Sequence, residues 1–178
     1  MIYLFLANGF EECEALVPLD ILRRANILVK TVGIGSNTIT GSHGISVNCD
    51  TINKDLPFDE LEGIILPGGL PGATNLEADK TVQSAIDHCS KSNLLITAIC
   101  AAPQILGHKG LLNGKKAVCF PGFEKELKGA DIVNQKVVRD GNIITAWGAG
   151  AAFEFGFAIL EYLTDTETAQ NLRQSMKY

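Results

Sequence analysis

The sequence predicts an α/β fold in which helices cover both faces of a mainly parallel sheet. Short apolar segments rich in β-branched residues recur along the chain, and stretches with helical periodicity separate them. Fully apolar strands are typical of parallel sheets, because both faces of such sheets are buried. These observations favour a doubly wound three-layer sandwich of the flavodoxin type.

The first half of the chain contains three expected strands. Residues 2–6 (IYLFL) and 27–34 (ILVKTVGI) form the first two, and a helix from about Glu12 to Ala25 connects them. The apolar side chains that share one face of this helix are Leu16, Leu19, Leu22 and Ala25. Residues 63–66 (GIIL) form the third strand, which ends at the glycine- and proline-rich segment 67–72.

The second half continues this alternation. A helix from about Asp79 to Ser90 precedes a fourth apolar strand at 94–99. A short helix is expected within 101–110, because Pro103 suits a first turn and Gly110 suits an end. The remaining expected elements are strands in KAVCF, DIVN, KVVRD and NIITAW and helices at about 151–163 and 166–176.

The composition is that of one soluble domain. The 178 residues are 46% hydrophobic and 20% charged, and no repeat or linker divides them, so residues 1–178 are expected to form a single domain. The net charge of −5 argues against nucleic acid as a partner, because phosphate binding needs clustered Lys and Arg. No secretory signal or membrane-spanning run is recognisable, which predicts a cytoplasmic protein without a membrane partner.

The five cysteines are irregularly spaced, at Cys13, Cys49, Cys89, Cys100 and Cys119. An odd number in a cytoplasmic protein indicates free thiols rather than disulfides, and most are expected to be buried. No short Cys or His pair indicates a metal, and no glycine motif indicates a bound nucleotide. We therefore expect no cofactor.

Three loops that follow predicted parallel strands carry reactive or polar groups. They contain Glu11, Glu12 and Glu14, then Gly68 and Gly69, and finally Cys100. Loops after parallel strands lie at the same edge of the sheet, where doubly wound folds bind their ligands. We therefore expect an active site at this edge.

Cys100 is the expected reactive residue. It stands between an apolar strand and the start of a helix, among the small residues Ala98, Ala101 and Ala102. A sharp strand-to-helix turn exposes a side chain, as in hydrolase nucleophile elbows, and a helix terminus lowers the pKa of a thiol. The alternative is a cysteine that is simply buried in the core.

The other two loops supply candidate partners for this thiol. The amides of Gly68, Gly69 and Ala101 are candidates to stabilise an oxyanion or a sulfinate, although glycine pairs also form ordinary turns. Glu14 is the acid that the helix directs toward the loop, and beside a thiolate its carboxyl group would stay protonated and donate a hydrogen bond. The other two acids are explained by favourable charge at a helix N-terminus.

Among the three histidines, only His43, in the loop TGSHGI, is a candidate site residue. His88 falls in the middle of a helix and His108 in the last turn of another, so both have structural explanations. The sequence does not define a Cys-His-Asp triad.

With these residues in hand, the chain resembles the ThiJ/PfpI superfamily, and within it the branch of the Parkinson-disease protein deglycase (DJ-one) and its bacterial relatives. The matching blocks are EECEALVPLDILRRA (11–25), IILPGGLPGATNL (64–76), AICAAPQIL (98–106) and TAWGAGAAFEFGFAILEYL (145–163). They occur in order over nearly the whole chain. The resemblance implies a flavodoxin-like sandwich similar to class I glutamine amidotransferases, and a homodimer.

The resemblance also implies roles for residues. It assigns catalysis to Cys100 and Glu14 and the backbone donors to Gly68, Gly69 and Ala101. Arg24 matches an arginine near the dimer interface of relatives, and His43 stands where relatives often have an arginine facing the site. Both residues, together with Phe120, are therefore possible site-lining residues. Ala101 and Phe120 stand where other branches have histidine, which argues against proteolysis.

Two functions follow from the resemblance. One is a cofactor-free glyoxalase, or a deglycase of proteins or nucleotides, whose substrate is a small aldehyde such as methylglyoxal or its glycated product. The Cys100 thiolate would add to the aldehyde while Glu14 moves protons. The other is an oxidative-stress sensor or redox-regulated chaperone in which Cys100 is oxidised to sulfinic acid. Both use the same site, so the sequence leaves both open.

Overall fold

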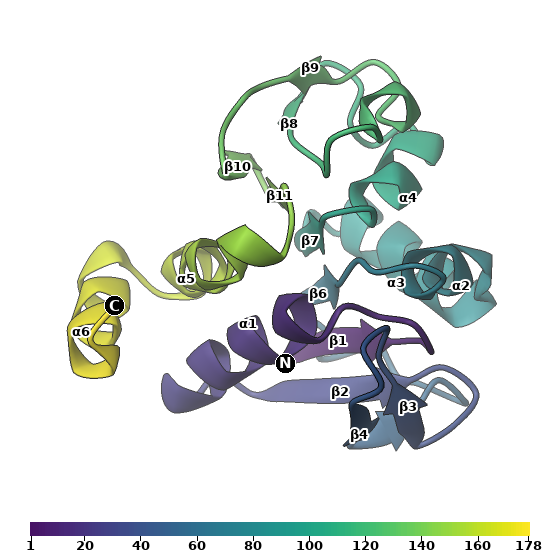
Figure 1. Ribbon diagram of the computed structural model, residues 1–178, viewed down its shortest axis with the longest axis horizontal. Coiled ribbons are helices and arrows are strands. Elements are labelled where there is room, and N and C mark those ends of the chain that lie inside the picture. The colour runs from purple at the N-terminus through teal and green to yellow at the C-terminus, as the bar shows by residue number, and fades with distance from the viewer.

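The computed structural model describes residues 1–178 and contains a seven-stranded sheet (Figure 1). In spatial order its strands are β10 (Val137–Asp140), β11 (Ile143–Ala146), β7 (Leu95–Ile99), β6 (Gly63–Leu66), β1 (Ile2–Leu6), β2 (Val29–Gly33) and β5 (Thr51–Ile52). Neighbouring strands are parallel except β10 and β11, which are antiparallel. The predicted α/β fold with a mainly parallel sheet is confirmed.

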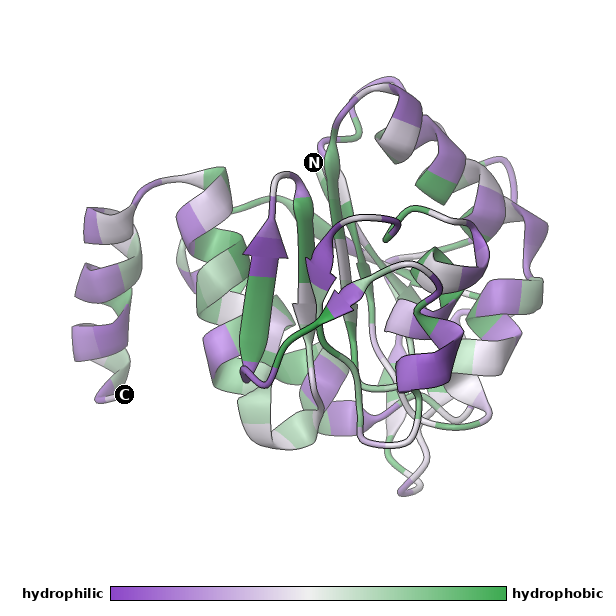
Figure 2. Ribbon diagram, turned by 90° about the horizontal axis from the view of Figure 1, so that it is seen from above, coloured by the Kyte–Doolittle hydropathy of each residue, from purple (hydrophilic) through white to green (hydrophobic).

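Two hydrophobic cores lie on opposite faces of the sheet. Tyr3 and Phe5 of β1 belong to one core, whereas Ile2, Leu4 and Leu6 belong to the other. The helices of the first face are α2 (Gly72–Ala78), α3 (Lys80–Lys91) and α4 (Pro103–His108), and those of the second are α1 (Glu12–Arg24) and α5 (Ala152–Leu163). Figure 2 shows largely hydrophobic strands enclosed by helices with hydrophilic outer faces. Burial on both faces explains why the strands read as apolar throughout.

The last helix, α6 (Thr166–Met176), forms an arm at the side of the molecule that carries the C-terminus (Figure 1). It packs against α5, where the Arg173 guanidinium lies 4.1 Å from the centre of the Phe157 ring. Neither this helix nor any other is both long and apolar enough to cross a bilayer.

Several elements differ from the sequence expectation. The structure adds the hairpin of β3 (Thr38–Thr40) and β4 (Ser46–Asn48), the short strand β5 and the helix α2. The hairpin consists mostly of exposed polar residues with only Ile39 fully buried, so it lacks a clear hydrophobic pattern. The expected strands in KAVCF and DIVN are reduced to β8 (Lys116–Ala117) and β9 (Asp131–Ile132), which pair with each other outside the main sheet.

Four loops meet at the carboxyl-terminal edge of the parallel strands. They follow β1, β6, β7 and β11. These four strands lie side by side in the sheet, in the order β11, β7, β6 and β1. Backbone hydrogen bonds join them, since Glu11 N donates to Gly68 O and Cys100 N donates to Ala146 O. This edge is where doubly wound folds place their sites.

Candidate active site

Cys100 forms a sharp turn between β7 and α4. Its backbone φ is 65°, in the left-handed region that costs a non-glycine residue about 1–3 kcal/mol. Two hydrogen bonds hold this turn, because Cys100 N donates to Ala146 O at 2.9 Å and Phe120 N donates to Cys100 O at 2.9 Å. The side chain is half-buried. The strained strand-to-helix turn predicted at Cys100 is confirmed.

Glu14 is a buried carboxyl group in the first turn of α1, with 1% of its surface exposed. It accepts hydrogen bonds from Gly68 N at 2.9 Å, from the Ala149 amide and from the Cys100 thiol. Glu11 begins the helix, since its side chain accepts a hydrogen bond from Glu14 N at 2.7 Å. Burial raises the pKa of Glu14 to about 7, even though its hydrogen-bond donors lower it. Glu14 therefore changes charge near neutral pH.

The expectation of a lowered thiol pKa is wrong. Burial, followed by the negative charge and hydrogen bond of Glu14, raises the pKa of Cys100 to about 12. The amides of Gly69 and Ala101 hydrogen-bond to the sulfur and lower its pKa, but they do not outweigh these effects. The short helix α4 begins only at Pro103, so its dipole contributes little. Above about pH 7 the pair thus holds one proton, which the thiol donates to the Glu14 carboxylate.

The two glycines after β6 permit this close packing. A Cβ on Gly68 would lie 2.6 Å from both the Cys100 Cβ and the Glu14 Oε2, which no side chain tolerates. Gly69 has a φ of 83°, and a Cβ there would lie 2.4 Å from Glu11 N. The glycine loop therefore places Gly68 N against the Glu14 carboxylate and Gly69 N against the Cys100 sulfur. The Ala101 amide contacts the same sulfur from the turn after β7.

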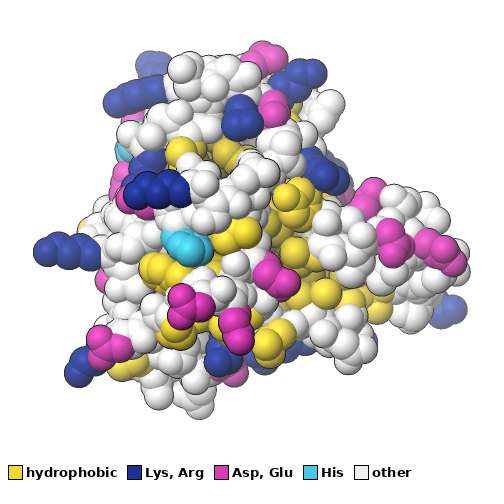
Figure 3. All heavy atoms as spheres, turned by 180° about the vertical axis from the view of Figure 1, so that it is seen from behind, with side chains coloured by type: hydrophobic (Ala, Val, Ile, Leu, Met, Phe, Trp, Pro, Cys, Tyr) yellow, Lys and Arg dark blue, Asp and Glu magenta, His cyan; other side chains and the backbone are white.

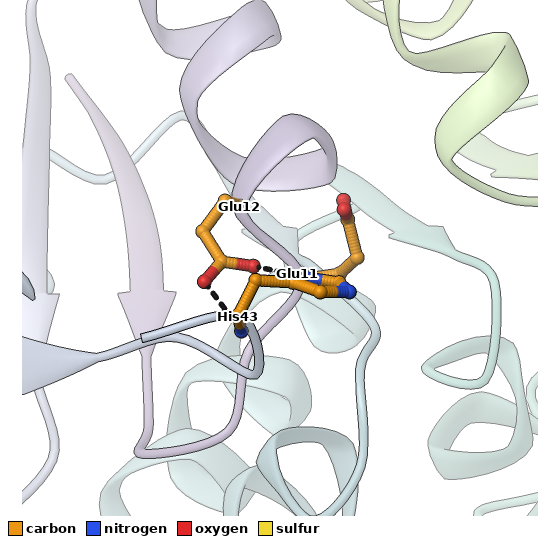
Figure 4. A group of neighbouring side chains, drawn as sticks. All are labelled: Glu11, Glu12 and His43. Carbon is orange, nitrogen blue, oxygen red and sulfur yellow. Dashed lines mark hydrogen bonds and ion pairs between the residues drawn. The ribbon is translucent and has the colours of Figure 1, made fainter. Parts of the chain in front are cut away.

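His43 lies at the outer side of this edge, where it anchors the β3–β4 hairpin to α1 (Figure 4). The nearly buried Glu12 carboxylate accepts hydrogen bonds from His43 N at 2.7 Å and from His43 Nδ1 at 2.8 Å. The Glu12 hydrogen bond raises the pKa of His43, whose side chain is 70% exposed. His43 makes no hydrogen bond to Cys100 or Glu14, so it is not the partner of the thiol.

The neighbouring Glu11 carboxylate extends away from the Glu12–His43 pair in the same view. Potential ligand atoms of Glu11, Glu12 and His43 lie within 4.8 Å of one another. The Glu12 oxygens, however, already accept hydrogen bonds from the hairpin, and Glu11 caps the helix. These hydrogen bonds explain why the three residues lie together: they attach the β3–β4 hairpin to the start of α1.

Arg24 does not line the site of its own chain, contrary to expectation. It lies in the last turn of α1, whereas Glu14 lies in the first, so about 15 Å of helix separates them. Its Nε donates to the Asp20 carboxylate at 2.7 Å, and its side chain is 53% exposed. The N-terminal end of α1, and not the end that carries Arg24, therefore faces Cys100.

The remaining histidines and cysteines have structural positions. His108 bridges Glu77 at 2.5 Å and Glu126 at 2.8 Å, and the His88 ring lies against Phe58. All five cysteines are free; Cys49, Cys89 and Cys119 are buried and Cys13 is exposed. The expectations of free thiols and of mostly buried cysteines are confirmed.

A hollow of about 390 Å³ is the part of the site that the sequence did not reveal. It is lined by Phe120, Pro121, Trp147, Gly148, Ala149 and Gly150. Phe120, a possible site-lining residue according to the resemblance, lies in the wall of this hollow. The other lining residues include the segment WGAG (147–150), which follows directly after β11. Sequence patterns identify this segment only as a loop before a helix.

Comparisons with known proteins identify the family from the whole chain. The DJ-1/PfpI family profile matches residues 1–162. The chain belongs to the DJ-1/PfpI family. It is 33% identical over 174 residues to the protein dj-1beta of Drosophila melanogaster, covering 96% of this chain and 93% of that protein. A deglycase of Pyrococcus abyssi is 32% identical over 143 residues, which cover 79% of this chain and 85% of the relative.

Solved structures of the DJ-1 superfamily have the same fold. The structure of oxidized Toxoplasma gondii DJ-1 superposes with a TM-score of 0.95 at 28% sequence identity. The match covers 99% of this chain and 97% of that chain. The helices and the mainly parallel sheet described above are thus those of the DJ-1 superfamily.

Proposed function

We propose that this DJ-1/PfpI protein is a cysteine-dependent, cofactor-free glyoxalase or deglycase that acts on methylglyoxal or glyoxal and their adducts. The observation that carries the proposal is the contact between the half-buried Cys100 thiol and the buried Glu14 carboxylate, whose pKa is about 7. A base with a pKa near the operating pH is suited to proton transfer. The similarity to a Pyrococcus deglycase supports the same assignment.

The first step is addition of Cys100 to the aldehyde. As the sulfur electron pair forms the C–S bond, the thiol proton moves to the Glu14 carboxylate and the carbonyl π pair moves to oxygen. That oxygen then takes the proton from Glu14, which gives a hemithioacetal. The amides of Gly69 and Ala101 face the sulfur, and they stabilise the negative charge that develops at the sulfur and the attached oxygen.

The second step moves a proton between two carbons. Glu14, again ionised, removes the proton from the carbon that bears sulfur and returns it to the neighbouring carbon through an enediol. The product is a thioester of a hydroxy acid, and water hydrolyses it to lactate or glycolate and the free Cys100 thiol. An adduct additionally releases its amine. No external oxidant or reductant is needed.

The direct test is the formation of lactate from methylglyoxal by the wild type and by Cys100→Ser. We expect lactate only with the wild type, because a serine hydroxyl is a far weaker nucleophile beside this base. Circular dichroism establishes that both proteins are folded. Equal turnover by the two proteins would contradict the enzyme proposal.

The second candidate is an oxidative-stress sensor or redox-regulated chaperone. The amides of Gly69 and Ala101 and the Glu14 carboxyl group surround the sulfur and suit the oxygens of a sulfinate. The raised pKa of Cys100 works against it, since the thiolate is the oxidised species. For this reason we favour the enzyme.

Intact mass after mild hydrogen peroxide tests the sensor. Two equivalents of peroxide convert the thiol to a sulfinic acid and release two molecules of water. The sensor predicts two added oxygens on the half-buried Cys100 and none on Cys49 and Cys89, whose burial keeps peroxide from the sulfur. Oxidation of all three cysteines to the same extent would exclude it.

A homodimer in the cytoplasm completes the proposal. Figure 3 shows hydrophobic side chains gathered between the body and the arm formed by α6, and Phe153 and Tyr178 are 40% and 49% exposed. Five free thiols suit a reducing compartment. Sedimentation equilibrium tests the dimer, and a monomer at micromolar concentration would contradict it.

A further inference from the structure

The hollow beside the reacting pair has aromatic walls and no charged lining residue. Phe120, Pro121 and Trp147 supply the side chains, and backbone of the Gly148–Gly150 segment supplies the rest. The Phe120 side chain is 47% exposed, so much of its ring is available to a ligand. Pockets of a few hundred Å³ with apolar walls are typical of sites for small molecules.

The walls of this hollow are the same segments that hold Cys100 and Glu14. Phe120 N donates to the Cys100 carbonyl, and the Ala149 amide hydrogen-bonds to Glu14. At Gly148, the position of an added Cβ lies 3.2 Å from the Phe120 ring and 3.9 Å from Glu14 Oε1. A group bound in the hollow therefore lies beside the Glu14 carboxyl group and the turn that carries Cys100.

The charge pattern decides which group the hollow accepts. None of its six lining residues is Lys, Arg or His, so an anionic substituent finds no counter-ion there. The Glu14 carboxylate next to it repels anions further. Aromatic side chains instead favour an uncharged planar group, which gains both apolar burial and ring stacking.

From these observations we infer that the site prefers α-oxoaldehydes that carry an aromatic or bulky apolar group, such as phenylglyoxal. The inference rests on the proposed function and adds the class of substrate. The phenyl group occupies the hollow between Phe120 and Trp147, and the aldehyde carbon faces Cys100. The reaction adds one water molecule to phenylglyoxal and gives mandelate, by the steps described for methylglyoxal. The methyl group of methylglyoxal leaves most of the hollow unfilled.

Kinetics with two aldehydes test the preference. We expect kcat/KM for phenylglyoxal, measured by mandelate formation, to exceed that for methylglyoxal by about tenfold or more, since filling an apolar pocket gives selectivity of this order. Phe120→Ala removes one wall but keeps the backbone donor, and should reduce the ratio to about one. Phe58→Ala, which removes an aromatic ring from the segment before β6, should leave the ratio unchanged.

Binding without turnover provides a second measurement. Trp147 is the only tryptophan of the chain, so its fluorescence reports occupation of the hollow directly. In Cys100→Ser, 2-hydroxyacetophenone should change this fluorescence in a saturable way, whereas its methyl counterpart hydroxyacetone should not. A free tryptophan amide measured in parallel corrects for light absorbed by the ketone.

The outcomes separate the two proposals. Turnover of methylglyoxal that equals or exceeds that of phenylglyoxal would overturn the aromatic preference and leave the proposed function intact. A loss in Phe120→Ala that is equal for both aldehydes, or the absence of saturable binding of 2-hydroxyacetophenone, would overturn it as well. If neither aldehyde is turned over by the wild type, the proposed function itself fails.

Discussion

Replacing Glu14 with glutamine should lower kcat/KM for an α-oxoaldehyde by about 10²- to 10⁴-fold, the usual contribution of a general base. The Glu14 carboxylate is the only side chain that hydrogen-bonds to the Cys100 thiol. A glutamine has nearly the same shape and can still accept the hydrogen bond from Gly68 N, but it cannot take a proton. The reaction would then depend on the small fraction of thiolate present at neutral pH.

The pH profile distinguishes this role from a merely structural one. Glu14 must be ionised to accept the thiol proton, so kcat/KM of the wild type should rise as the pH increases through about 7. Above pH 7 the wild-type value should level off, whereas the low residual value of Glu14→Gln should keep rising with pH as the Cys100 thiolate forms. Glu12→Gln is the matched control, because Glu12 is a nearly buried acid of the same helical turn that bonds to His43 instead. A profile of Glu14→Gln that still levels off above about pH 7 would exclude Glu14 as the base.

The position of Cys100 and Glu14 at one edge of the sheet could be predicted because local patterns encode it. Cys100 follows an apolar strand and precedes a helix, and Glu14 stands in the first turn of a helix after another strand. Strand order then brings the two loops together, since β1 and β7 both flank β6. The fold follows from the same apolar periodicity, which is why the long strands and helices agree with the prediction.

The charge state of the pair could not be predicted in this way. Whether a helix terminus or burial dominates the thiol pKa depends on how closely Cys100 and Glu14 approach, and this approach depends on the packing around Gly68. The position of His43 likewise depends on a contact across 31 residues, to Glu12. Neither contact leaves a periodic signal in the sequence.

The aromatic hollow escaped prediction for a related reason. Phe120 and Trp147 lie 27 positions apart in the chain, each at the end of an expected strand that stops before it in the structure. The structure brings them together because β11, which precedes Trp147, pairs with β7, and the loop containing Phe120 is hydrogen-bonded to Cys100. Tertiary pairing, rather than local propensity, therefore creates the pocket.

The same Glu14→Gln substitution should make the folded protein more stable at pH 8. Burial raises the pKa of Glu14 from its ordinary value of 4.5 to about 7 in the folded state. Below pH 4.5 the carboxyl group is protonated in both the folded and the unfolded chain, so the difference in pKa has no effect on stability. Between pH 4.5 and 7 only the unfolded chain loses the proton, and the free energy of unfolding falls as the pH rises.

Above pH 7 the folded protein bears the full cost of a buried charge, about 3 kcal/mol for this difference in pKa. Glutamine carries no charge and avoids this cost.

Urea unfolding at pH 8 should therefore give a higher free energy of unfolding for Glu14→Gln than for the wild type, and the difference should disappear toward pH 4.5. Glu12→Gln should show no such gain, because burial raises the pKa of Glu12 but the hydrogen bonds around its carboxylate, chiefly from His43, bring it below the ordinary value. A variant that gains stability where it loses activity would mean that the buried carboxylate is retained for chemistry at the expense of stability. Equal stability of Glu14→Gln and the wild type at pH 8 would contradict a raised pKa for Glu14, and with it the basis for its role as the base.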